Sequence, residues 1–85
     1  MGKRDRVVEQ VLGGTADANI AFDDLCRLLE QIGFEVRIRG SHHLFRKSEV
    51  IERINLQRDG SKAKPYQVRQ VRQILVKYNL AVEED

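Results

Sequence analysis

The spacing of apolar residues changes abruptly at Gly33. Before this glycine, residues 22–32 carry an apolar stripe with the 3.6-residue period of an amphipathic helix. The stripe consists of Phe22, Leu25, Cys26, Leu28, Leu29 and Ile32. After it, residues 35–39 alternate between polar and apolar side chains, which is typical of a strand with one buried face. A helix followed at once by a strand predicts an α+β fold.

The same kind of pattern predicts two further strands and a closing helix. Gly40-Ser41 is typical of a tight turn, so residues 42–47 are expected to form the return strand. Residues 51–57 predict a third strand, with Ile54 and Leu56 on one side and Arg53, Asn55 and Gln57 on the other. Residues 58–61 have the composition of a loop. Residues 65–78 begin with proline and continue at helical spacing, which predicts the last helix.

These elements predict a two-layer α+β sandwich. The helices over 22–32 and 65–78 cover one face of a three-stranded antiparallel sheet and leave the other face free. A chain of 85 residues provides one domain and one small core, with no room for a second catalytic domain or a deep cleft.

The first residues are predicted to form an accessory element joined to this core, and three roles stay open for it: packing on the body, self-association or contact with a partner protein. Residues 4–12 have helical spacing, and Gly13-Gly14 ends the helix. We therefore expect residues 1–21 to form an accessory helix and connector. The compact domain then spans residues 22–80, and residues 81–85 form an acidic tail.

Charge is segregated along the chain. Residues 35–72 hold ten basic and four acidic residues, a net charge of +6, whereas the segments on either side are each net −2. A basic middle indicates a polyanionic partner, nucleic acid first, and a solvated basic face is the alternative.

The apolar runs are too short for a membrane span. The single cysteine excludes an internal disulfide and favours a reducing compartment, the cytoplasm.

Few residues have the chemistry for a metal site or for catalysis. His42 and His43 are neighbours, and neighbours in a strand point to opposite faces, so they are poorly placed to share a metal ion. Cys26 lies in an apolar stripe and is expected to be a buried hydrophobe rather than a reactive thiol. We expect no metal and no other cofactor.

If Phe45 fills the core, strand parity turns His43 inward and His42 outward.

An outward His42 lies beside a Gly-Ser turn and among arginines, which suits RNA cleavage without a metal. A neutral imidazole can remove the proton of a 2′-hydroxyl, whose oxygen then attacks the adjacent phosphate while cations stabilise the developing charge. The alternative is a surface histidine that only contacts phosphate.

Other polar groups are candidates to hold the RNA. Lys62 and Lys64 precede the last helix, whose N-terminal N–H groups attract phosphate, although they are equally compatible with solvated loop lysines. Arg69 and Arg72 are three residues apart and share a helix face. Tyr66 is the one candidate to stack on a base. The residues expected to bind RNA are Arg37, Arg39, Ser41, Arg46, Lys62, Lys64, Arg69 and Arg72.

Four stretches of the chain occur in a familiar order. They are Phe22-Asp23-Asp24-Leu25-Cys26-Arg27-Leu28-Leu29, then Ile32-Gly33-Phe34, then Arg39-Gly40-Ser41-His42-His43-Leu44-Phe45-Arg46, and finally Lys64-Pro65-Tyr66-Gln67-Val68-Arg69-Gln70-Val71-Arg72. Together they resemble the HicA (YcfA-like) toxin family of toxin–antitoxin systems, over about residues 22–80. The Gly-Ser-His triplet at this spacing is the most specific part of the resemblance.

The resemblance implies a fold like that of double-stranded-RNA-binding domains, with a helix, three strands and a helix. It also implies a ribonuclease that cuts messenger RNA with His42 as the essential residue, and a HicB-type antitoxin that covers the active face. Many family members carry Val-Pro-X-His on the third strand, where this chain has Asn55-Leu56-Gln57-Arg58. Either Gln57 or Arg58 then takes the place of that second histidine, or the activity is weaker.

The sequence therefore predicts the toxin of a type II toxin–antitoxin system, a metal-independent mRNA interferase. Two alternatives stay open. One is a non-catalytic RNA-binding module on the same fold, in which His42 and the arginines only hold phosphate. The other is a protein-interaction domain whose acidic partner binds the basic face.

Overall fold

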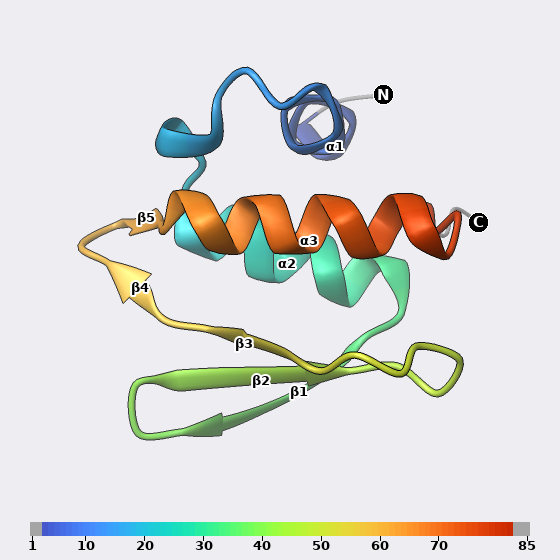
Figure 1. Cartoon of the computed structure of the whole chain (residues 1–85). Coiled ribbons are helices and arrows are strands. Elements are labelled where there is room, and N and C mark those ends of the chain that lie inside the picture. The colour runs from blue at the N-terminus through green and yellow to red at the C-terminus, as the bar shows by residue number, and fades with distance from the viewer. Residues whose placement is uncertain (1–2, 83–85) are drawn as a thin grey trace.

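Residues 3–82 fold into helices that cover one face of a three-stranded antiparallel sheet (Figure 1). These residues are the ones described by the structure, a computed structural model. The elements in chain order are α1 (Lys3–Gly13), the 3₁₀ turn η1 (Asp17–Asn19), α2 (Phe22–Ile32), β1 (Glu35–Arg39), β2 (His42–Arg46), β3 (Ile54–Leu56), β4 (Arg58–Asp59), β5 (Lys62–Ala63) and α3 (Pro65–Lys77). The order α2-β1-β2-β3-α3 confirms the predicted α+β core. The acidic residues of the expected tail, 83–85, lie outside the described residues.

The apolar stripe before Gly33 forms α2 with the bounds that its spacing predicts. The buried residues of this helix are Phe22, Leu25, Leu28, Leu29 and Ile32. Asp23 and Asp24 lie in the first turn, where the helix dipole favours negative charge. Gly33 ends the helix with a φ of 119°, a left-handed conformation that glycine adopts without a steric penalty.

The pairing of the strands determines which way each side chain faces. Val36 pairs with Phe45, and Phe45 pairs with Ile54, so these three share one face. Phe45 is 1% exposed and Ile54 is fully buried, which makes theirs the inner face, under the helices. Because neighbouring residues alternate, His43 faces inward and His42 outward. The orientation that strand parity predicts is confirmed.

The third strand is shorter than predicted. It covers only Ile54–Leu56, whereas the alternation suggested residues 51–57. A turn closed by the bond from Val50 N–H to Lys47 C=O precedes it, and Ile51 is 87% exposed. Ile51 lies three positions before Ile54, so it is out of phase with the buried side formed by Ile54 and Leu56, and the predicted strand began too early.

The predicted loop over residues 58–61 is wrong, because part of it is a small hairpin. Arg58–Asp59 and Lys62–Ala63 form strands β4 and β5 around Gly60, whose φ is 64°. Ser61 C=O accepts from Phe22 N–H at 3.0 Å, and Ile20 C=O accepts from Ala63 N–H at 2.9 Å. The hairpin is thus ordered by the chain that leads into α2, a contact that no local pattern reveals.

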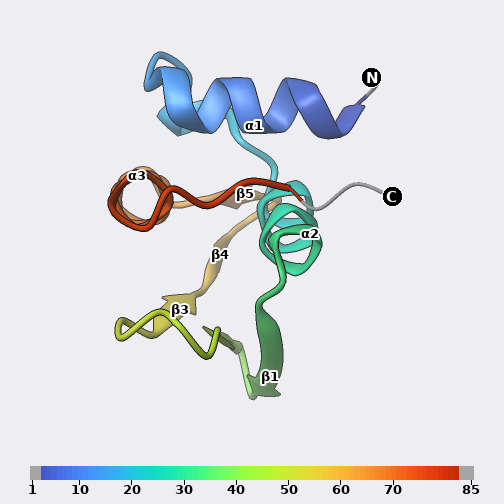
Figure 2. The same ribbon diagram turned by 90° about the vertical axis from the view of Figure 1, so that its right-hand side faces the viewer.

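The first segment packs on the core as an additional layer. Figures 1 and 2 show α1 crossing α2 and α3 on the side away from the sheet. Val11 is fully buried and Ile20 is 1% exposed, and both belong to the same core as α2. Residues 3–21 therefore pack on the body formed by the core helices.

Cover of the inner sheet face is incomplete at β1. Val36 and Ile38 were expected to be half-buried, but Val36 is 36% and Ile38 is 59% exposed. Figure 2 shows β1 running away from α2 as it leaves Gly33, so the gap to the helices widens along the strand. The edge strand consequently exposes residues on both of its faces.

Candidate active site

The outer face of the sheet gathers the polar side chains that the sequence predicts for function. Cross-strand pairs place Glu35 beside Arg46, Arg37 beside Leu44 and Asn55, and Arg39 beside His42. These pairs share the face opposite Phe45, because the side-chain period of a strand is two. The face therefore carries three arginines and His42 on two adjacent strands.

His42 is exposed at the start of β2, directly after the Gly40-Ser41 turn. Its Nδ1 lies 3.2 Å from Oδ1 of Asn55 on β3. Beside it, Nε2 of Gln57 donates to Oγ of Ser41 at 3.2 Å. Two amide side chains, Asn55 on β3 and Gln57 directly after it, thus contact two consecutive residues of the hairpin.

His43 lies on the other side of the sheet. It is half-buried, and its ring meets the ring of Phe22 edge-on, with centroids 5.0 Å apart. The two adjacent histidines therefore cannot bind the same ligand. Among the residues that the structure describes, no three or more His, Cys, Asp or Glu side chains are grouped to hold a metal ion.

A hollow of about 410 Å³ lies on the outer face, and His42 is not among the residues that line it. It is lined by Glu35, Val36, Arg37, Arg39, Leu44, Phe45, Arg46 and Arg53. We call it the arginine groove, after Arg37, Arg39, Arg46 and Arg53. Within the described part of the chain, only Arg46 has an acidic partner there, Glu35 at 3.7 Å, and this pair is exposed and weak. Arg39 lines the groove and also pairs across from His42, so it connects the two.

Arg53 is a groove residue that sequence reasoning left out of the candidate set. The signal was present, because alternation in the third strand places Arg53 on the same side as Asn55 and Gln57. Only the folded chain shows that Arg53, just before the short strand β3, lines the groove together with arginines of β1 and β2.

A family model described as "HicA toxin of bacterial toxin-antitoxin" matches residues 22–76, well over half of the chain. The chain belongs to the HicA toxin family. The match begins at the first residue of α2 and ends one residue before the end of α3, so it covers the α-β-β-β-α core and excludes α1. No curated protein and no solved structure among those compared matches the chain.

Membership in this family makes the protein the toxin of a toxin–antitoxin system, which works together with an antitoxin. The resemblance of the Gly-Ser-His segment and of the last helix is thereby confirmed at the level of the family. None of the helices within residues 3–82 is long and apolar enough to cross a membrane.

The last helix of this HicA toxin separates Arg69 from Arg72. Arg69 is exposed, whereas the guanidinium of Arg72 donates to both carboxylate oxygens of Asp17, at 3.0 and 3.2 Å, and to Val11 C=O at 3.1 Å. The hydrogen bond to Asp17 raises the pKa of Arg72. The two arginines therefore do not present one phosphate-binding face. Arg72 instead connects α3 to the segment around η1, and we leave it out of the RNA-binding set.

The two lysines lie away from the outer sheet face. Lys62 Nζ donates to Asn19 Oδ1 at 3.3 Å, and Lys64 is the half-buried residue that precedes α3. Figure 1 shows the β4-β5 hairpin at the same end of the molecule as the β1-β2 turn. Tyr66, in the first turn of α3, is 57% exposed. None of these three residues lines the arginine groove.

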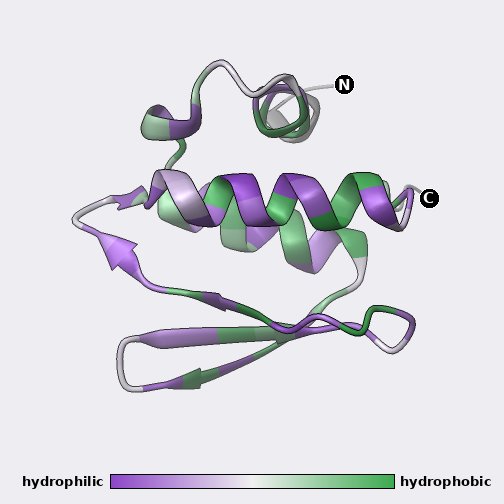
Figure 3. Cartoon of the chain, viewed as in Figure 1, coloured by the Kyte–Doolittle hydropathy of each residue, from purple (hydrophilic) through white to green (hydrophobic). Residues whose placement is uncertain are grey.

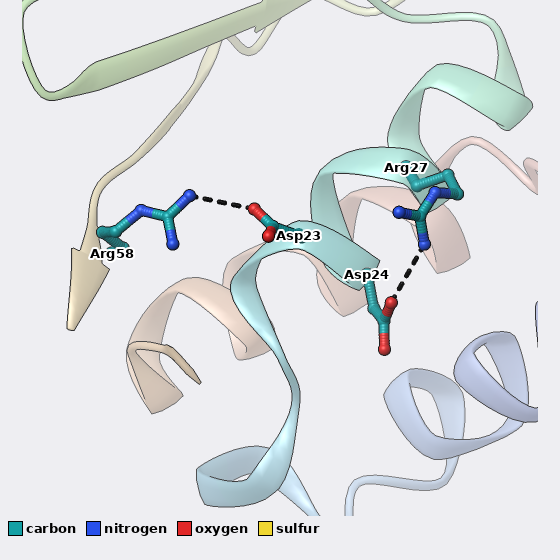
Figure 4. A network of polar contacts seen from close by, with 4 residues as sticks. All are labelled: Asp23, Asp24, Arg27 and Arg58. Atoms are coloured by element: carbon teal, nitrogen blue, oxygen red, sulfur yellow. Dashed lines mark hydrogen bonds and ion pairs between the residues drawn. The ribbon is translucent and has the colours of Figure 1, made fainter. Parts of the chain in front are cut away.

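Arg58 points away from His42. Its Nη2 donates to Asp23 Oδ1 at 2.9 Å (Figure 4), and its guanidinium carbon lies 4.5 Å from the centroid of the Phe22 ring. Of the two residues considered as substitutes for the family's second histidine, only Gln57 therefore contacts the hairpin that bears His42.

Cys26 has the environment of a structural thiol. Burial raises its pKa to about 11, and the nearby Asp23 and Glu30 carboxylates act in the same direction. A thiol that stays protonated is a poor nucleophile. Figure 3 shows that the turn end of β2, where His42 lies, is hydrophilic and that a hydrophobic stretch follows it along the strand.

Proposed function

We propose that this HicA toxin is an endoribonuclease that cleaves messenger RNA without a metal ion, with His42 as its catalytic residue. The observation that carries the proposal is the exposed imidazole of His42 on a sheet face rich in arginine. A neutral imidazole is the side chain best suited to accept and return a proton near neutral pH.

The proposed reaction moves one proton twice. The imidazole removes the proton of a 2′-hydroxyl, and the 2′-oxygen attacks the neighbouring phosphorus. The bond from phosphorus to the 5′-oxygen breaks, and that oxygen takes the proton from the imidazolium. The products are a 2′,3′-cyclic phosphate and a 5′-hydroxyl end. Arg39, paired across from His42, offsets the charge that develops on the phosphate oxygens.

The RNA is proposed to lie along the arginine groove. Arg37, Arg39, Arg46 and Arg53 contact phosphates there, and Ser41 lies next to the reacting linkage. Lys62, Lys64 and Arg69 are proposed to contact more distant phosphates. Such contacts release counterions, so binding is expected to weaken steeply with salt.

The antitoxin is proposed to be of the HicB type and to cover the outer sheet face. A partner with acidic side chains there would neutralise the arginine groove and block His42 at the same time. The cytoplasm, where messenger RNA is translated, is the proposed place of action.

The test is cleavage of labelled RNA by the purified toxin in EDTA. Wild type is expected to produce fragments with cyclic phosphate ends, and His42→Ala is expected to lose cleavage while still binding RNA. Because His42 is exposed, the variant should keep the wild-type unfolding midpoint, which excludes misfolding as the cause.

Other outcomes point to the other functions. Salt-sensitive binding by wild type without cleavage would establish a non-catalytic RNA-binding module. If wild type neither cleaves nor binds RNA, the proposal fails and a protein-interaction domain is left.

A further inference from the structure

Asn55 is the residue of β3 that touches the catalytic ring. It pairs directly with Leu44 and not with His42, so its side chain reaches diagonally to the ring across the outer face. Such diagonal neighbours are close enough for long or aromatic side chains to meet. Here Oδ1 of Asn55 lies 3.2 Å from Nδ1 of His42, within hydrogen-bonding distance.

The chemistry of the two atoms determines where the proton is. An amide oxygen only accepts hydrogen bonds, so a hydrogen bond between these two atoms requires a proton on Nδ1 of His42. A neutral imidazole has one ring proton, which leaves Nε2 with a free lone pair. Without such a partner, the neutral ring in water favours the opposite form, with the proton on Nε2.

We propose that Asn55 is a positioning residue that holds His42 in the tautomer needed of a general base, with Nε2 unprotonated and directed at the 2′-hydroxyl of the RNA. This inference rests on the proposed ribonuclease function. Asn55 itself touches no reacting atom, and it acts through the ring.

The strand under Asn55 is firmly held. Its two neighbours, Ile54 and Leu56, are fully buried on the inner face. One residue further on, Gln57 N–H donates to the side-chain oxygen of Gln67 at 3.3 Å, and Gln67 is the buried polar residue of α3. An acceptor on an anchored strand orients its partner more accurately than one on a free loop.

Gln57 supports the same hairpin from the same strand. Its Nε2 donates to Ser41 Oγ at 3.2 Å, next to the bond between Asn55 and His42. Gln57 holds the turn, whereas Asn55 holds the ring, so the two amides offer a matched pair of substitutions. Only the loss of Asn55 should change the ring proton.

The primary test is the ring tautomer of His42, measured by long-range ¹H–¹⁵N correlation on the full chain without RNA, at a pH where the ring is neutral. Wild type is expected to show a protonated Nδ1 and an unprotonated Nε2. Asn55→Leu is expected to move the proton toward Nε2, Asn55→Asp to keep it on Nδ1, and Gln57→Leu to leave it unchanged. A wild-type ring protonated on Nε2 overturns the proposal.

Kinetics provide the second readout. Asn55→Leu is expected to lower kcat about tenfold with KM unchanged, since orienting partners typically contribute factors of this size. Asn55→Asp, which keeps an acceptor oxygen, should restore most of kcat. If Asn55→Leu cleaves as fast as wild type, Asn55 does not position the base.

The two proposals fail in different ways. An inactive His42→Ala together with a fully active Asn55→Leu would leave the ribonuclease function standing and overturn the role of Asn55. Cleavage that survives in His42→Ala would overturn the ribonuclease mechanism, and with it the role of Asn55, whatever tautomer the ring adopts.

Discussion

Adjacent residues of β2 have opposite surroundings on the two faces of the sheet. On the inner face Phe45 is buried in the core and His43 packs on Phe22. On the outer face His42 is exposed, and Leu44 lies in the wall of the arginine groove. The inner face therefore supplies stability, and the outer face can carry chemistry at little cost to the fold.

The last helix shows the same division. Arg72 turns inward to Asp17 and Val11, with 22% of its side chain exposed, whereas Arg69, one turn earlier, faces solvent. Two arginines of identical chemistry thus serve different ends. The residue type alone does not tell whether an arginine is bonded within the protein or is exposed to a ligand. The contacts made in the folded chain tell the two cases apart.

The largest effect is expected from emptying the inner face. Phe45→Ala should lower the free energy of unfolding by about 3–5 kcal/mol, because it removes a buried aromatic ring and leaves a cavity. Leu44→Ala, on the outer face, should cost about 1 kcal/mol. Urea unfolding measures both, and equal losses would mean that the two faces do not differ.

The two arginines of α3 should separate stability from RNA binding. Arg72→Gln is expected to cost about 2 kcal/mol of unfolding free energy, since it breaks a partly buried, charged hydrogen-bond pair. It should leave RNA affinity unchanged. Arg69→Gln should weaken RNA binding and leave the free energy of unfolding unchanged. Thermal unfolding and RNA titrations on both variants check this, and weaker RNA binding by Arg72→Gln would return Arg72 to the binding face.

The arginine groove should control the salt dependence of RNA binding. Arg39→Gln is expected to lower the slope of log Kd against log salt by about 0.7, the value for one lost phosphate contact on a single strand. Arg27→Gln is the control, because Arg27 is exposed on α2 and bonded to Asp24 at 3.1 Å (Figure 4). Equal slopes for the two variants would contradict a binding role for the groove.

The smallest effect is expected from a structural contact between the loop before β3 and the end of α3. Hydrogen bonds from Lys77 and Tyr78, each 2.8 Å long, lower the pKa of Glu52 to about 2. Because the pKa of Glu52 is lower in the folded state than its ordinary value of 4.5, its ionised carboxylate stabilises the fold at pH values above 4.5. This contribution to stability is lost as the pH falls toward 2.

In Glu52→Gln the free energy of unfolding should therefore fall less between pH 4.5 and pH 2 than in wild type. The rate of RNA cleavage should be unchanged. Urea unfolding at a series of pH values measures the decline. An unchanged acid dependence in the variant would show that this carboxylate is not responsible.

Much of the core could be predicted because its signals are local. The change of period at Gly33 places α2 and β1 with their observed bounds, and strand parity around Phe45 correctly turns His42 outward. These predictions need only the geometry of one element at a time.

The features that were missed depend on contacts between distant parts of the chain. The β4-β5 hairpin forms because Ile20 and Phe22 bond to it, and Arg72 is occupied by Asp17, 55 positions earlier in the chain. The bond between His42 and Asn55 needs the register of β2 on β3. No periodicity within one segment contains that information.

The most direct test of the account exchanges the two adjacent histidines separately for glutamine. His42→Gln is expected to lower the rate of RNA cleavage in EDTA by about 10²–10⁴-fold, with the unfolding midpoint unchanged. His43→Gln, under the same conditions, should keep the wild-type rate and lower the midpoint, because it alters the contact with Phe22. A His42→Gln protein that still cleaves RNA, or a loss of cleavage confined to His43→Gln, would contradict the assignment of catalysis to the outer face.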